Sequence, residues 1–154
     1  MPKVQANGVE LYYEWHGPEG ADVLVLSNGV FANTQGWVYQ KPVLSKHFRL
    51  LLYDCRGQGQ SAHPAGPYTM ERHADDLKGL LDALGIAQAH IGGISYGGEI
   101  SLIFGYRYPE ATKSVIAVSA VSQVDPLLRG IIEGWKIAVA TRDGEKFVWL
   151  SHTG

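Results

Sequence analysis

The sequence predicts an α/β fold, in which a mostly parallel, twisted sheet carries helices on both of its faces. Residues 23–26, 48–53 and 90–94 are apolar runs with little polar alternation, which is typical of strands buried on both sides. Stretches with helical periodicity separate these runs, and strands that alternate with helices at this spacing connect through right-handed crossovers. The 154 residues, 45% of them hydrophobic, suffice for one domain with a core.

The N-terminal part is expected to form an antiparallel hairpin. Residues 4–6 and 9–15 are short strand candidates, and the Asn7-Gly8 pair between them is a strong signal for a two-residue turn. After the first buried strand, a glycine- and asparagine-rich loop leads into a helix-like stretch from about residue 35 to residue 44.

The middle of the chain predicts an amphipathic helix between the second and third buried strands. Thr69 is its candidate N-cap and Gly85 its candidate end. Between them, apolar residues recur at spacings of three and four: Met70, Ala74, Leu77, Leu81 and Leu84. A second helix is expected up to residue 108, where Pro109 stops it, and a last strand over residues 115–121.

Composition excludes several classes of function. The net charge is −2 without a basic run, which argues against a nucleic-acid or anionic-membrane surface. A single cysteine, Cys55, excludes an internal disulfide framework and suits a reducing compartment. Residues 1–5 carry no apolar segment of the kind found in signal peptides, and no apolar run approaches the ~18 residues of a membrane span. We therefore expect a soluble cytoplasmic protein without cofactor or metal.

The most informative motif is Gly93-Ile94-Ser95-Tyr96-Gly97, which reads Gly-x-Ser-x-Gly between a strand-like and a helix-like run. A serine on such a sharp turn is exposed and is a candidate nucleophile, and the glycines allow the turn because they lack a Cβ. The following helix would direct its free N–H groups to the place where an oxyanion develops. The alternative is a chance serine in a glycine-rich loop.

Three motifs in this order resemble the N-terminal part of an α/β-hydrolase over about residues 3–125. They are residues 27–30 (Ser-Asn-Gly-Val) with Trp37 downstream, residues 54–61 (Asp-x-Arg-Gly-x-Gly-x-Ser) and the turn at Ser95. The first loop is most similar to the branch of 3-oxoadipate enol-lactonases and carboxylesterases. The chain departs from many members of the family by having Asn28 where they have histidine.

The resemblance implies roles for individual residues. Ser95 would be the nucleophile, and the backbone N–H groups of Val30 and Tyr96 would form the oxyanion hole. The side chains of Phe31, Trp37 and Tyr96 would line an acyl pocket, with ordinary packing as the alternative. Glu99, one turn after the nucleophile, is interpreted as a structural helix carboxylate. The Asp54, Arg56 and Gly57 loop is likewise interpreted as structural rather than catalytic.

The acid and base of the catalytic triad have no clear candidates. The family order is Ser, then Asp or Glu, then His, and five of the six histidines precede Ser95. Only His152 follows, and Asp125 after the last strand is a weak candidate acid. The sequence is therefore interpreted as residues 1–125 of a hydrolase core, incomplete at its C-terminal side, followed by the start of a helical cap over residues 126–154.

Two consequences are expected from this incomplete core. The chain alone would be nearly inactive, because a serine without its histidine keeps only oxyanion and binding contributions. The last strand would expose an apolar edge, so we expect the C-terminal half as a separate polypeptide, or self-association that covers the edge.

The leading hypothesis for function is a serine hydrolase that cleaves a carboxylic ester or lactone through an acyl-enzyme on Ser95. Serine rather than aspartate at this position argues against dehalogenase or epoxide hydrolase activity. The alternatives are a C–C bond hydrolase, a perhydrolase, and a non-catalytic binding module with the same fold.

Overall fold

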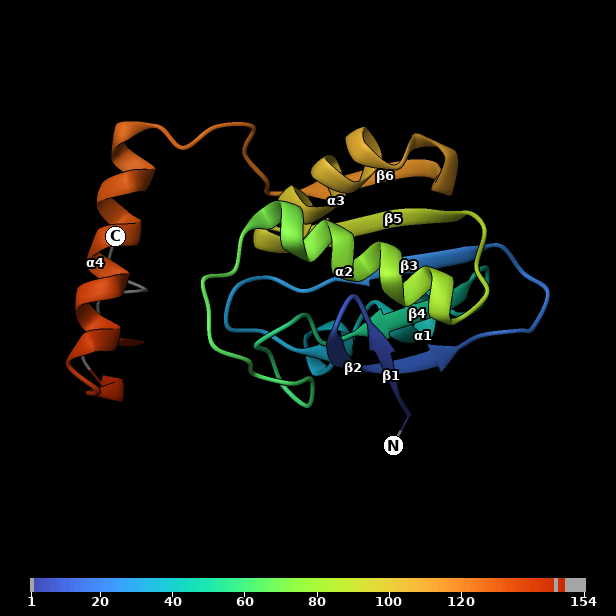
Figure 1. The fold of residues 1–154 in the computed structure, drawn as a ribbon, viewed down its shortest axis with the longest axis horizontal. Helices are drawn as coiled ribbons and strands as arrows, with labels where there is room; N and C mark the ends of the chain where they lie inside the picture. The colour runs from blue at the N-terminus through green and yellow to red at the C-terminus, as the bar shows by residue number, and fades with distance from the viewer. Residues whose placement is uncertain (1, 146, 149–154) are drawn as a thin grey trace. The chain divides into compact units, whose positions relative to one another are not determined.

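The computed structural model describes residues 2–145 and 147–148 and divides the chain into two compact units, residues 1–120 and 121–154. The first unit is built on a six-stranded sheet of order β1-β2-β4-β3-β5-β6 (Figure 1). Pairs β1/β2 and β2/β4 are antiparallel and the other pairs are parallel. The strands are β1 Lys3–Ala6, β2 Val9–His16, β3 Val23–Ser27, β4 Arg49–Tyr53, β5 Ala89–Ile94 and β6 Thr112–Val118.

The N-terminal hairpin is confirmed. Ala6 pairs with Val9, and the two residues between them have φ values of 47° at Asn7 and 72° at Gly8. Positive φ at both central residues is the requirement of the tightest hairpin turn, and Asn-Gly satisfies it at low cost.

The core lies on both faces of the sheet, as the apolar strands predicted. Val25, Leu51 and Ile91 belong to the cluster packed against α2 (Met70–Ala83) and α3 (Tyr96–Arg107), which lie across one face (Figure 1). Their neighbours along the strands point to the opposite face because successive strand residues alternate. There Leu24, Leu26, Leu50 and Leu52 pack against Trp37, Leu44 and Phe48.

The helix expected over residues 35–44 is wrong as a single element. The chain forms a 3-10 turn, η1 (Thr34–Trp37), and then a four-residue helix, α1 (Lys41–Leu44). Asn33 starts the turn by accepting a hydrogen bond from the Gln35 backbone N–H. Pro42 has no N–H to donate back to residue 38, so one continuous helix cannot pass through it.

The two long helices of the first unit are confirmed. Thr69 caps α2 by accepting a bond of 3.1 Å from the Arg72 backbone N–H, and Gly85 follows the helix end with φ 69°. Helix α3 begins at Tyr96, immediately after Ser95, and ends before a short 3-10 turn, η2 (Pro109–Ala111). The glycine-rich first turn is part of α3, and its Gly97 and Gly98 are packed into the core.

Strand β6 forms one edge of the sheet and ends at Val118, not at Val121 as expected. Ser119 has φ 51°, which turns the chain out of the extended conformation. Ile116 and Val118 remain 45% and 47% exposed. Within the described residues this edge has no further strand beside it.

The second unit contains helix α4 (Pro126–Ala140). Asp125 caps it by accepting a bond of 2.8 Å from the Leu128 backbone N–H, so this carboxylate, the candidate acid, is used by the helix. Of the helical cap expected over residues 126–154, residues 146 and 149–154 lie outside the described residues. No helix in the described parts of the chain is long and apolar enough to cross a bilayer.

Candidate active site

Ser95 occupies the turn between β5 and α3. Its backbone has φ 53° and ψ −121°, a conformation that costs energy for any residue with a Cβ. The turn is held on both sides, since the Ser95 N–H donates to the Val118 carbonyl (2.8 Å) and the Ser95 carbonyl accepts from the Glu99 N–H (3.0 Å). The residue is exposed, and within the described residues its hydroxyl has no hydrogen-bond partner. An exposed, uncommitted hydroxyl on a strained turn is what a nucleophile requires.

The two glycines of the motif are required by contacts with backbone. A Cβ on Gly93 would lie 2.2 Å from the Gly97 carbonyl oxygen. A Cβ on Gly97 would lie 2.1 Å from the Ser27 carbonyl oxygen and 2.7 Å from that of Asn28. These contacts are far below van der Waals distance and involve atoms that cannot turn aside. The start of α3 therefore packs directly against the end of β3.

The loop after β3 forms the second wall beside Ser95. At Gly29, the position of a Cβ would be 3.7 Å from the Ile94 carbonyl oxygen and 4.0 Å from the Ser95 Cβ. Val30 and Phe31 follow, both exposed, and Phe31 has φ 57°. The loop is closed by a bond of 3.2 Å from the Ala32 N–H to the Gly29 carbonyl. The structure thus brings Val30 into the same neighbourhood as Ser95 and Tyr96.

Asn28 is buried and holds this loop to the sheet. Its side-chain nitrogen donates to the Tyr53 carbonyl (2.8 Å), and its oxygen accepts from the indole N–H of Trp37 (2.8 Å). An asparagine can do both because it offers a donor and an acceptor on one planar group. The residue that departs from the family pattern is therefore a structural anchor.

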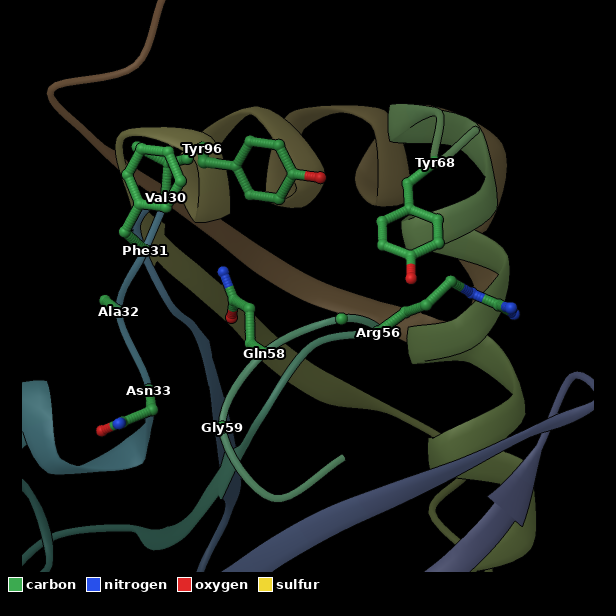
Figure 2. Close-up of a pocket in the computed structure, with 10 residues that line it drawn as sticks. Val30, Phe31, Ala32, Asn33, Arg56, Gln58, Gly59, Tyr68 and Tyr96 are labelled. Carbon is green, nitrogen blue, oxygen red and sulfur yellow. The ribbon is translucent and has the colours of Figure 1, made fainter. Parts of the chain in front are cut away.

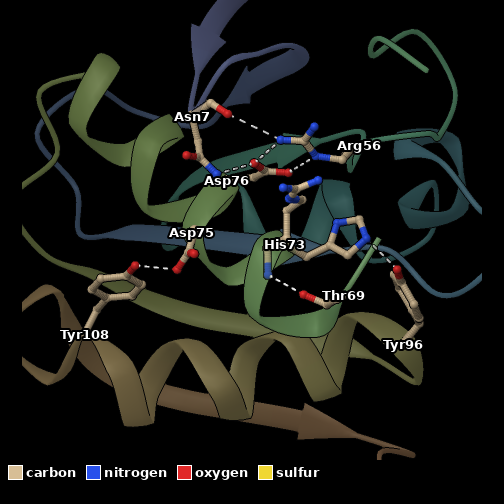
Figure 3. Close-up of polar contacts among 9 residues, drawn as sticks. Asn7, Arg56, Thr69, His73, Asp75, Asp76, Tyr96 and Tyr108 are labelled. Atoms are coloured by element: carbon tan, nitrogen blue, oxygen red, sulfur yellow. Dashed lines mark hydrogen bonds and ion pairs between the residues drawn. The ribbon is translucent and has the colours of Figure 1, made fainter. Parts of the chain in front are cut away.

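The loop over residues 54–61 is tied down by buried polar contacts. Asp54 accepts from the backbone N–H groups of Thr34 and Gln60, both at 2.8 Å. Arg56 forms two bonds of 2.7 Å with Asp76 on α2, and the two side chains are 8% and 1% exposed (Figure 3). The guanidinium of Arg56 and the carboxylate of Asp76 are therefore paired with each other.

A cavity of about 400 Å³ lies between these loops and α3 (Figure 2). It has three aromatic walls, Phe31, Tyr68 and Tyr96, and Gln58 points into it. Its remaining lining residues are Val30, Ala32, Asn33, Arg56, Gly57 and Gly59. Because Arg56 is neutralised by Asp76, the cavity is aromatic and carries no net charge. Of the three expected pocket residues, Trp37 lies elsewhere and lines a smaller cavity of about 150 Å³.

Tyr96 is fixed by a buried histidine. Its hydroxyl forms a bond of 2.5 Å with Nε2 of His73 on α2, and the two rings meet edge to face (Figure 3). Burial lowers the pKa of His73 and raises the pKa of Tyr96, so both groups are held in their neutral forms. The other ring nitrogen, Nδ1, is buried with no partner among the described residues.

No described residue is placed to act as base toward Ser95. His73 is bonded to Tyr96, and His152 lies outside the described residues. Glu99, one turn after Ser95, is half-buried, and this burial raises the pKa of its carboxyl. The one cysteine, Cys55, is buried with its pKa raised to about 12, so it is not a competing nucleophile. Among residues 2–145 and 147–148 no cluster suited to a metal ion is found.

Sequence reasoning missed two residues of this site, Gln58 and His73. His73 could have been found, because it falls on the apolar stripe of α2 one residue before Ala74. Gln58 occupies a variable position of the Asp-x-Arg-Gly-x-Gly-x-Ser motif, and nothing in the sequence marks it.

Comparison with known proteins agrees with this architecture. The family profile described as the alpha/beta hydrolase fold matches residues 22–145. A Caulobacter (strain K31) protein named "Putative carbamate hydrolase RutD" is 34% identical over 122 residues, which are 77% of this chain and 46% of that protein. The "3-oxoadipate enol-lactonase 2" of Acinetobacter baylyi is 32% identical over 119 residues, 77% of this chain and 45% of the enzyme. The chain thus spans about half the length of the curated relatives it matches.

Solved structures give the same result. The alpha/beta hydrolase MGS-M2, from a deep-sea metagenome library of the Medee basin, superposes with a TM-score of 0.91 at 35% identity, over 97% of this chain and 55% of that one. The enol-lactonase of Burkholderia xenovorans LB400 gives a TM-score of 0.79 at 29% identity, over 97% of this chain and 66% of that one. The chain belongs to the α/β-hydrolase fold family.

Proposed function

We propose that this chain carries the nucleophile half of a serine hydrolase that cleaves a carboxylic ester or lactone. The observation that carries the proposal is the exposed hydroxyl of Ser95, which has no hydrogen-bond partner in the described part of the chain and sits on a strained turn at the start of α3. The Ser95 oxygen attacks the acyl carbon, and the N–H groups of Val30 and Tyr96 stabilise the oxyanion. The leaving oxygen departs with a proton, and water then hydrolyses the acyl-enzyme.

The proton of Ser95 needs an acceptor, which we propose to be a histidine oriented by an acid. In the order of the family these groups follow Ser95, and they would come from the C-terminal half of a complete fold, as a separate chain. That half, or a second copy of this chain, would also cover the edge of β6, where Ile116 and Val118 are exposed.

The names of relatives favour a second candidate within the same chemistry. Several are named for carbamate hydrolysis, and attack of Ser95 on a carbamate carbonyl would give a carbamoyl-enzyme through the same oxyanion. The cavity does not decide between the two, since its walls are aromatic and its one cation is paired.

The test is acylation of Ser95 by p-nitrophenyl acetate, followed by intact mass and by release of p-nitrophenol. With a co-expressed C-terminal half of a relative that supplies the base, we expect a mass increase of one acetyl group on the wild-type chain and none on Ser95→Ala. Phenyl carbamate is the parallel probe for the second candidate. Absence of any adduct at Ser95, both alone and with a co-expressed C-terminal half of a relative, would favour a binding module and contradict the proposal.

A further inference from the structure

Gln58 links the two loops that flank the cavity. Its side-chain nitrogen donates to the Gly29 carbonyl at 3.0 Å, across 29 positions of sequence. Its oxygen accepts a longer bond of 3.4 Å from the side-chain nitrogen of Asn28. Figure 2 shows the amide group reaching from the loop after β4 toward Val30 and Tyr96. Both ends of this amide are therefore engaged with the loop that carries Val30.

The contact at Gly29 bears directly on the Val30 N–H. The Gly29 carbonyl and the Val30 N–H belong to one planar peptide unit, which is trans, so the two groups point in opposite directions. The same carbonyl also accepts the Ala32 N–H at 3.2 Å. Two donors on one carbonyl oxygen hold the plane of the peptide, and with it the direction of the N–H on its other side.

This loop needs such a restraint more than the turn at Ser95 does. The Tyr96 N–H belongs to the first turn of α3 and is oriented by the helix. Val30 lies in a loop outside any helix or strand, next to a glycine whose backbone rotates at little steric cost. Without a donor at the carbonyl, the Gly29–Val30 peptide can turn and direct its N–H away from Ser95.

We propose that Gln58 is a positioning residue of the oxyanion hole, which directs the Val30 N–H toward Ser95 by holding the Gly29 carbonyl. This inference rests on the proposed function, because an oxyanion at Ser95 is what the N–H would serve. Gln58 acts through the peptide and not on the substrate, so its loss is expected to slow acylation and to leave ester binding nearly unchanged.

The experiment uses two substitutions of similar size and one control. Gln58→Met removes the donor, and Gln58→Glu replaces it with an acceptor that repels the carbonyl. Gln35→Met removes the same amide at an exposed position that lines neither cavity. For each variant, crystal structures give the orientation of the Gly29–Val30 peptide. Stopped-flow kinetics with p-nitrophenyl acetate give the acylation rate constant and the half-saturating ester concentration, after urea denaturation has verified folding.

We expect the peptide to rotate in both Gln58 variants and the acylation rate constant to fall at least tenfold, toward the hundredfold or more seen on loss of a whole oxyanion donor. The half-saturating concentration should change less than about twofold, and Gln35→Met should match wild type. The inference is overturned if the Gly29–Val30 peptide keeps its orientation in Gln58→Met. It is also overturned if this peptide rotates and the acylation rate constant stays at the wild-type value. If wild type is acylated neither alone nor with a co-expressed C-terminal half of a relative, the proposed function fails, and the peptide orientation alone then decides the role of Gln58.

Discussion

The two walls of the candidate site, the turn at Ser95 and the loop over residues 28–32, are held in different ways. At Ser95, the neighbours that fix the turn are backbone atoms: the Val118 carbonyl, the Glu99 N–H and the close approach of Gly97 to Ser27. The loop over residues 28–32 is held mainly by side chains, those of Asn28 and Gln58. The first wall is rigid through packing, and the second through a few directional bonds.

This difference indicates which wall of the site can be changed by single substitutions. The contacts at the Ser95 turn join backbone atoms of α3 to those of β3 and β6, so they offer no side chain that could be exchanged to adjust them. Side-chain bonds across 25 and 29 positions of sequence can be changed one at a time. The loop over residues 28–32 is therefore the wall at which geometry can vary while the sheet stays intact.

The largest effect is expected from a substitution that breaks the first wall. Gly97→Ala introduces a Cβ about 2.1 Å from the Ser27 carbonyl oxygen, and no side chain there can move aside. We expect the free energy of unfolding in urea to fall by about 3 kcal/mol or more. Gly36→Ala is the control, since a Cβ there meets nothing within 4 Å and should change stability little. Equal stability of the two variants would show that the turn is not held by packing.

A smaller effect is expected from the second wall. Asn28→Ala leaves the buried Tyr53 carbonyl and the Trp37 indole N–H without their partners. The cost of such unsatisfied groups predicts a loss of about 2 kcal/mol in unfolding free energy. Asn33→Ala is the matched control, because the bond it removes is exposed and should cost less than about 1 kcal/mol. If Asn33→Ala costs as much as Asn28→Ala, burial is not what makes Asn28 important.

The contrast between the walls also explains which features the sequence could predict. The Asn7-Gly8 turn, the Thr69 cap and the Gly-x-Ser-x-Gly motif are each recognised from residues within a few positions of each other. The three family motifs then predicted the α/β-hydrolase fold, which the comparisons confirm. What the sequence could not supply depends on distant partners. Gln58 is meaningful only once β4 and β3 are adjacent.

The errors have the same origin. Periodicity suggested one helix over residues 35–44, but Pro42 interrupts it. The strand expected to reach residue 121 turns at Ser119, where a positive φ is set by the surrounding fold and not by the residue type. Trp37 lines the smaller cavity and donates its indole N–H to Asn28, so its role beside an acyl group stays a prediction.

A third, smaller effect is expected from the backbone strain at Ser95, in the first wall. Its φ of 53° and ψ of −121° are costly for alanine and serine alike but accessible to glycine. We expect Ser95→Gly to be more stable than Ser95→Ala by about 1 kcal/mol, because relief of ~1–3 kcal/mol of strain outweighs the greater backbone entropy of glycine. Both variants lack the hydroxyl, so the pair isolates the backbone. A more stable Ser95→Ala would mean that the turn is unstrained.

The smallest effect concerns His73, which braces the first wall through Tyr96. Burial lowers the pKa of His73, with the nearby Arg56 cation acting in the same direction and Asp76 opposing it. The folded-state pKa is thus below the unfolded value of about 6.5. At pH values above the unfolded pKa, both states are neutral and the stability is fully present. As the pH falls from there toward the folded pKa, the unfolded state binds the proton first, and stability is lost.

Replacement of His73 should therefore flatten the dependence of stability on pH. We expect the unfolding free energy of wild type to decline more steeply than that of His73→Gln between about pH 7 and pH 5, because glutamine has no proton to bind in this range. Exposed His47, replaced by Gln, serves as control and should keep the wild-type slope. Urea denaturation at a series of pH values measures all three proteins. A His73→Gln slope equal to that of wild type would mean that the buried ring takes up its proton as readily in the folded chain as in the unfolded one.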